Sequence, residues 1–184
     1  MSQSAVDRIY TEFRDASTVL KERGEVSLSN AIDESSRKAL LLAAASYFEL
    51  RISEDVLLFC REIAGTNTLV PALIKNKAVS RQYHTWFDWD GNTATKFYSL
   101  FGPDFKSHME DIIKGNSEIG EAVKNFIEVG RDRNRLVHQD FATFSLEKTA
   151  DEIYRQYRSA LTFVNIIPVE LRKCSNIVGI NDGL

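Results

Sequence analysis

The segment GRDRNRLVHQD, from Gly130 to Asp140, combines residue types that can perform acid–base chemistry on a phosphate group. On a helix with about 100° between successive residues, Asn134 and His138 lie about 100° and 140° from Arg133, so the three side chains share one sector. Histidine transfers protons near neutral pH, and arginine stabilises the added charge of a phosphorane-like transition state. Neither role requires a metal ion.

A structural interpretation of the same segment stays open. Lys and Arg are favoured in the last turn of a helix by the helix dipole, so a run of arginines is also typical of a solvated helix end. Leu136 falls about 300° from Arg133 and can pack on the opposite side of the helix. The polar residues therefore need not lie in open water for this helix to bury an apolar face.

The elements that must position this segment are predicted to be helices. Apolar residues recur at helical spacing, and few of the 9 Gly and 3 Pro interrupt the first third of the chain. The sequence predicts an all-α fold, with a single domain over residues 1–172 and a weakly patterned tail over 173–184. The expected helices cover approximately residues 6–20, 31–64, 71–79, 92–101, 104–114, 117–138 and 146–167.

Several helix ends are predicted from local signals. Gly24 is expected to end the first helix, and the polar stretch 25–30 to precede one long helix or two nearly collinear ones. Ser145 is the expected cap of the last long helix, which should end before Pro168. The segment 81–105 mixes aromatic residues with Asp-Gly and Gly-Pro and is expected to be rich in loops. The final residues, NDGL, are expected to be mobile.

Composition limits the classes of partner and compartment. The 23 Lys and Arg against 26 Asp and Glu give a formal net charge of −3, so any site for a polyanion must be local. Cys60 and Cys174 lie far apart and match neither a zinc pattern nor a disulfide framework. The most apolar stretch, 39–45, is far shorter than the ~20 residues of a membrane span. We therefore expect a cytoplasmic protein with no membrane contact, metal or other cofactor.

The residues Arg133-Asn134-Arg135-Leu136-Val137-His138 match the signature R-[polar]-x-x-x-H, and on this motif the chain resembles the HEPN superfamily of α-helical ribonucleases. The long apolar second helix, the aromatic segment NTATKFYSLFG, the penultimate motif helix and the long final helix agree with the HEPN layout. The resemblance covers roughly residues 5–168. It is greatest to the stand-alone RiboL-PSP and MAE-type HEPN proteins of prokaryotic defence and toxin systems.

The resemblance implies a HEPN-like helical bundle with a long second helix and extra short helices, assembled as a symmetric homodimer. Motif residues of two subunits would form one composite site of a metal-independent endoribonuclease, in a toxin–antitoxin or antiviral defence system. His138 would exchange a proton with the RNA 2'-hydroxyl, Arg133 would hold the scissile phosphate, and Asn134 would orient one of them. The products would carry a 2',3'-cyclic phosphate. The implied partners are RNA, a second copy and an antitoxin or defence-system protein.

Neighbouring residues extend this candidate site. Arg131 and Arg135 are expected to contact the RNA substrate. The broader family pattern tolerates Arg131 as the motif arginine, but Asp132 follows it and would offset its charge, so Arg133 is preferred. HEPN toxins paired with nucleotidyltransferase antitoxins carry a tyrosine two residues after the histidine, where this chain has Asp140. Asp140 is a secondary candidate that either orients His138 or caps the helix end.

The remaining polar candidates have weaker support. His84 lies among aromatic residues that either stack on single-stranded RNA or cover the core, and the second interpretation is favoured because Asp88 and Asp90 would repel a phosphate backbone. His108 is expected to be an exposed helix residue. The long second helix also carries three acidic residues that either face the motif helix or form a charged flank, and these are Glu49, Glu54 and Asp55.

Two other functions remain as alternatives to the ribonuclease. A catalytically silent module of the same fold would bind RNA or a partner protein, and a purely structural helical dimer would have no site. The intact set of Arg133, Asn134 and His138 favours the enzyme, because a binding module would not need histidine beside arginine.

Overall fold

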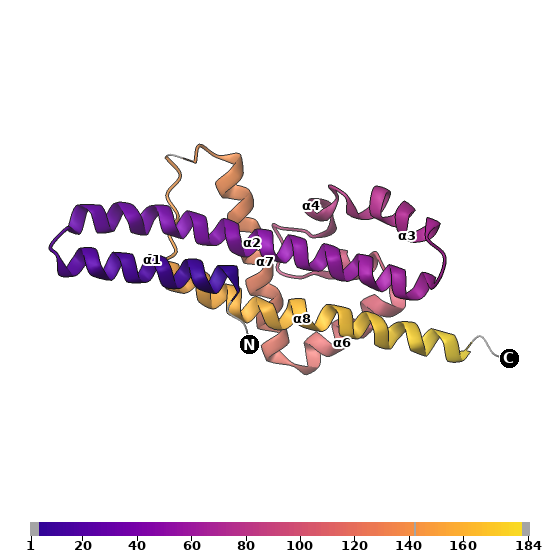
Figure 1. Ribbon diagram of the computed structural model, residues 1–184. Helices are drawn as coiled ribbons and strands as arrows, with labels where there is room; N and C mark the ends of the chain where they lie inside the picture. The colour runs from indigo at the N-terminus through magenta and orange to yellow at the C-terminus, as the bar shows by residue number, and fades with distance from the viewer. Residues whose placement is uncertain (1–3, 142, 182–184) are drawn as a thin grey trace.

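The computed structural model describes residues 4–141 and 143–181, and the regular elements in these ranges are all helices (Figure 1). α1 (Ala5–Glu22) and α2 (Val26–Ala64) form an antiparallel pair. α8 (Ala150–Asn181) runs along the second part of α2, and α7 (Ser117–His138) packs against both. The predicted all-α class is therefore confirmed for the described residues.

The first two helices begin and end for local reasons. The Ser4 hydroxyl accepts from the Asp7 N–H, and the Asp7 carboxylate accepts from the Ser4 N–H, which gives α1 a capping box. α1 ends before Gly24, whose φ of 75° favours glycine. The prediction that residues 25–30 precede the second helix is wrong, because α2 begins at Val26. There Ser29 is buried and its hydroxyl lies 3.1 Å from that of Ser17, so packing against α1 outweighs the weak helix propensity of the stretch.

The ends of α8 differ from the prediction. Its cap is Thr149 and not Ser145, because the Thr149 hydroxyl accepts from the Glu152 N–H while the Glu152 carboxylate accepts from the Thr149 N–H. The helix also continues through Pro168 to Asn181, although it was expected to end before the proline. Buried Ile167 and Leu171 keep this part of α8 packed on the core. Of the predicted mobile NDGL segment, residues 182–184 lie outside the described residues.

The segment between α2 and α7 is built from short helices. The expected helix over 71–79 begins two residues earlier and changes to a π-helical turn, and the segment 81–105 contains two short helices as well as loops. Asn67 caps the helix that begins at Leu69 by accepting from the N–H groups of Leu69 and Val70. In order the elements are α3 (Leu69–Ile74), η1 (Lys75–Val79), α4 (Tyr83–Trp86), α5 (Thr95–Ser99) and α6 (Pro103–Gly115).

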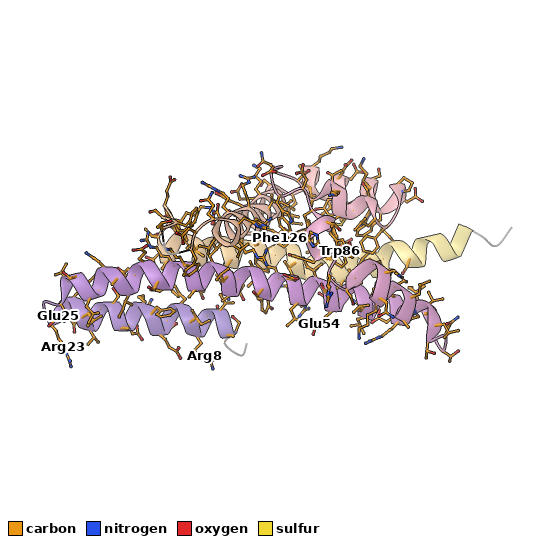
Figure 2. All side chains as sticks on the ribbon, turned by 90° about the horizontal axis from the view of Figure 1, so that it is seen from above. Arg8, Arg23, Glu25, Glu54, Trp86 and Phe126 are labelled. Carbon is orange, nitrogen blue, oxygen red and sulfur yellow. The ribbon has the colours of Figure 1, made fainter. Side chains whose placement is uncertain are left out.

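The core joins α2, α7 and α8 to the aromatic segment 81–105. The predicted inward residues of α7 are buried, as are Trp86 and Phe87, so aromatic residues near His84 cover the core as the favoured interpretation stated. In Figure 2, Trp86 and Phe126 lie on the same side of α2. These predicted inward residues are Val123, Phe126 and Ile127.

The prediction that His108 is an exposed helix residue is wrong. It is half-buried rather than exposed, and its Nε2 lies 2.8 Å from Oε2 of buried Glu170 on α8. The pairing connects α6 to α8, a tertiary contact that no local signal in KSHMED could indicate. Within the described ranges, no helix is long and apolar enough to cross a membrane.

Candidate functional site

The last turns of α7 carry the motif. Asn116 caps the helix by accepting from the N–H groups of Glu118 and Ile119, and α7 then runs without interruption to His138, as predicted. Leu136 is fully buried, which confirms that the motif helix packs through this residue. Its other face carries the polar motif side chains.

Arg133, Asn134 and His138 line one cavity of about 360 Å³. Phe48 of α2 and Phe126 of α7 contribute apolar surface to the same cavity. Ligand-binding pockets typically measure roughly 300–1,000 Å³ and combine an apolar lining with a few polar groups. The structure thus brings together the three side chains that the sequence placed in one sector, in a space large enough for a small ligand group.

Arg133 is arranged to meet an anion. Its Nη1 donates to the Asn134 amide oxygen over 3.1 Å, so Asn134 orients the guanidinium. Among the described residues, no carboxylate lies within ion-pair distance of Arg133. The neighbouring Asp132 is buried and pairs with Lys148, whose Nζ also donates to Glu128 over 2.7 Å. The Asp132 charge is therefore offset on the core side of α7, which leaves the Arg133 charge available to a ligand.

Arg131 hydrogen-bonds to the backbone of the loop formed by residues 89–92. Its Nε donates to the Trp89 carbonyl oxygen over 2.9 Å, and its Nη2 donates to Gly91 and Asn92 oxygens. These bonds fix the 89–92 loop against α7, which gives Arg131 a structural role. Arg135 is exposed, and its guanidinium lies 5.9 Å from the centre of the Phe144 ring. Of the two predicted RNA contacts, Arg131 is bonded to the 89–92 loop, whereas Arg135 is exposed and, among the described residues, makes no such bond to this loop.

The segment that follows His138 is held by α2. Buried Lys38 donates from Nζ to the Phe141 carbonyl oxygen over 2.9 Å, and Arg37 donates to the Leu146 carbonyl oxygen over 2.9 Å. Asp140 is exposed, and its backbone carbonyl accepts from the N–H groups of Thr143 and Phe144, so it forms a turn directly after the helix. These contacts restrain the end of α7 on which His138 lies.

Four further residues line the same cavity, and the sequence had left their roles open. Glu49 of α2 and His84 of α4 contribute charge or an imidazole, and Tyr83 and Trp89 contribute aromatic surface. Burial raises the pKa of the Tyr83 hydroxyl, the Glu49 carboxylate raises it further, and Arg133 opposes this shift. The opposing effects indicate that both charged groups act on the same buried hydroxyl. The signal available in the sequence was the mixture of His84 with aromatic residues.

Of the acidic group on α2, only Glu49 lines this cavity. Asp55 is buried and pairs with Arg51 over 2.8 Å. Glu54 is exposed and lies in Figure 2 on the opposite edge of α2 from Trp86 and Phe126. In the part of the chain that the structure describes, no group of three or more His, Cys, Asp or Glu is placed to hold a metal ion.

Comparison with known proteins identifies the family. The family model described as RiboL-PSP-HEPN matches residues 7–172, which is most of the chain. Curated proteins and solved structures gave no match.

Proposed function

Because the chain belongs to the RiboL-PSP-HEPN family, we propose that it is a metal-independent endoribonuclease that uses Arg133, Asn134 and His138. The observation that carries this proposal is their arrangement in one cavity, with the guanidinium oriented by the amide and the imidazole at the end of the same helix face. A cation and a proton-transfer group are what cleavage of a phosphodiester by its own 2'-hydroxyl requires.

The proposed reaction is an internal transesterification. His138 takes the proton of the 2'-hydroxyl, and the 2'-oxygen forms a bond to the adjacent phosphorus. Arg133 stabilises the negative charge that develops on the phosphoryl oxygens, since its fork of N–H donors can hold two of them. The bond from phosphorus to the 5'-oxygen then breaks, and this oxygen takes up a proton. The products are a 2',3'-cyclic phosphate and a free 5'-hydroxyl.

Protonation of the leaving oxygen requires a second acid, which we assign to a second copy of the chain. In a symmetric dimer the two motif helices would face one cleft, and His138 of the second copy would donate this proton. Such a cleft would bring at least four positive charges together from Arg133 and Arg135, and an RNA backbone would screen their repulsion. A role in a toxin–antitoxin or antiviral defence system, with RNA as the target, belongs to the same proposal.

The test compares RNA cleavage by the purified wild-type protein and the His138→Ala variant. His138 is exposed, so the variant should keep its melting temperature, while cleavage should fall by ~10² to 10⁴, as for loss of a proton-transfer group. Equal cleavage by the two proteins would show that His138 is not the proton-transfer group, and absence of cleavage by both would favour the silent binding module.

A further inference from the structure

The cavity beside the motif has apolar walls and one accessible aromatic ring. Phe48, Phe126 and Tyr83 line it but are themselves buried, so the ring that a ligand can reach is that of half-buried Trp89. The phosphate and ribose of RNA would leave this ring without an apolar contact. A nucleobase matches it, because unpaired bases bind proteins by stacking on aromatic side chains.

Trp89 is fixed so that it offers ring surface only. Its indole N–H donates to the His84 carbonyl oxygen over 3.0 Å, and its ring lies directly against Gly130 of the motif helix. The ring is half-buried and lines the cavity. With its one donor already bonded, the remaining interaction open to this residue is stacking.

Glu49 supplies the polar group that would select among bases. It is exposed, it lines the cavity, and among the described residues no cation lies within ion-pair distance of it. A carboxylate repels the phosphate that Arg133 would attract, so its use at this site must be toward another part of the RNA. An ionised carboxylate only accepts hydrogen bonds, and it can accept two side by side.

We propose that this cavity binds one unpaired guanine of the RNA, with Trp89 stacking on the base and Glu49 accepting from its N1–H and its exocyclic amino group. Guanine is the base whose Watson–Crick edge presents two adjacent donors. Adenine and cytosine each present one amino donor beside an acceptor nitrogen, and uracil presents one donor between two carbonyl oxygens. A carboxylate can therefore accept two hydrogen bonds side by side from guanine, whereas with each of the other bases it accepts one and its second oxygen faces an acceptor or a C–H group. The identity of the ligand as RNA rests on the proposed function.

Binding is measured in the His138→Ala background, so that the RNA stays intact. The probes are fluorescein-labelled oligouridines with a single central guanosine, adenosine, cytidine or uridine, and the readout is fluorescence anisotropy. The guanosine probe should bind about tenfold or more tightly than the other three, the discrimination expected of a bidentate contact to a base. Adding Glu49→Gln should remove this preference, because the amide replaces one acceptor with a donor.

Glu54→Gln is the matched control, since Glu54 is an exposed carboxylate of the same helix that does not line the cavity. It should leave the guanosine preference unchanged, and both variants should keep the parent melting temperature. Equal affinity for the four probes, no binding at all, or a preference that survives Glu49→Gln would overturn the inference.

Cleavage mapping with the wild-type protein separates this inference from the proposed function. Cleavage without enrichment of guanosine near the cut would overturn the guanine site and leave the ribonuclease standing. Preferential binding of the guanosine probe without cleavage by the wild-type protein would support the base site and overturn the ribonuclease.

Discussion

The indole ring of Trp89 lies so close to Gly130 that a Cβ atom at position 130 would fall 2.0 Å from its Cζ3. The contact joins the 89–92 loop to the motif helix three residues before Arg133. Arg131 reinforces it through its bonds to the same loop. Glycine at position 130 is therefore a requirement of packing, and it sets the position of one wall of the cavity.

Gly130→Ala should displace Trp89 and destabilise the protein. Overpacking of this kind costs about 1–3 kcal/mol. Gly120→Ala is the control on the same helix, because its Cβ would lie 3.7 Å from the nearest side-chain atom, an ordinary contact. That change should stabilise the helix by up to about 1 kcal/mol. Urea denaturation measures both, and a Gly130→Ala variant as stable as Gly120→Ala would contradict the packing argument.

Substitutions of Arg133 should separate charge from geometry. Arg133→Ala should abolish cleavage, and Arg133→Lys should restore only part of it, since an ammonium keeps the charge but lacks the planar fork that holds two phosphate oxygens. Arg135→Ala should weaken RNA binding more than turnover and reduce its salt dependence, as expected for a backbone contact outside the chemistry. Steady-state kinetics over a salt series measures these effects. Full activity of Arg133→Lys would show that the fork is not used.

Local patterns predicted the motif helix and its polar face well. The helix lies over the expected range 117–138, the apolar period gives the buried side, and the spacing of Arg133 and His138 places them in one sector. The rest of the cavity depends on tertiary contacts between segments far apart in sequence. The sequence left open whether Glu49 faces the motif helix or belongs to a charged flank, and the folded chain places it in one cavity with Arg133, more than eighty residues later. The bonds that tie Arg131 to residues 89–92 are likewise visible only in the folded chain.

The wrong start of the last helix has a local origin. Ser145 and Thr149 are both acceptable caps by residue type, and the choice between them follows from Glu152, three residues after Thr149, which completes the reciprocal bonds of a capping box. Lys38 shows the opposite case, because it is buried inside α2 and bonds to the Phe141 carbonyl oxygen, 103 residues later. A single sequence does not specify a partner at that separation.

Lys148→Met should destabilise the protein because it leaves the buried Asp132 carboxylate without its cation. Removing one partner of a buried pair costs about 3 kcal/mol or more. Lys124→Met is the control, since Lys124 pairs with Glu121 at the exposed surface of α7, the helix that carries Asp132, and its loss should cost within about 0.5 kcal/mol. Adding Asp132→Asn to Lys148→Met should recover much of the loss in urea denaturation. Equal effects of the two lysine substitutions would contradict the role assigned to Lys148.

The Glu170 carboxylate should make stability depend on acid pH. Burial raises its pKa, but hydrogen bonds from Lys173 and His108 lower it more, so the pKa lies below the ordinary value of 4.5. A lowered pKa contributes stability that is present above 4.5 and is lost as the pH falls through the folded-state pKa. Glu170→Gln should therefore be less stable than wild type near neutral pH, with a difference that shrinks in acid. A difference independent of pH in thermal melts would refute this.

The most direct test of the proposed ribonuclease is the chemistry of the new RNA ends formed in the presence of EDTA. Purified wild-type protein should cleave RNA in the chelator and leave a 2',3'-cyclic phosphate on the 5' fragment, because the 2'-oxygen attacks with only protein groups assisting. His138→Ala, folded to the same melting temperature, should leave the RNA intact. Loss of cleavage in EDTA that Mg²⁺ restores, or cleavage by the His138→Ala variant at the wild-type rate, would contradict the proposal.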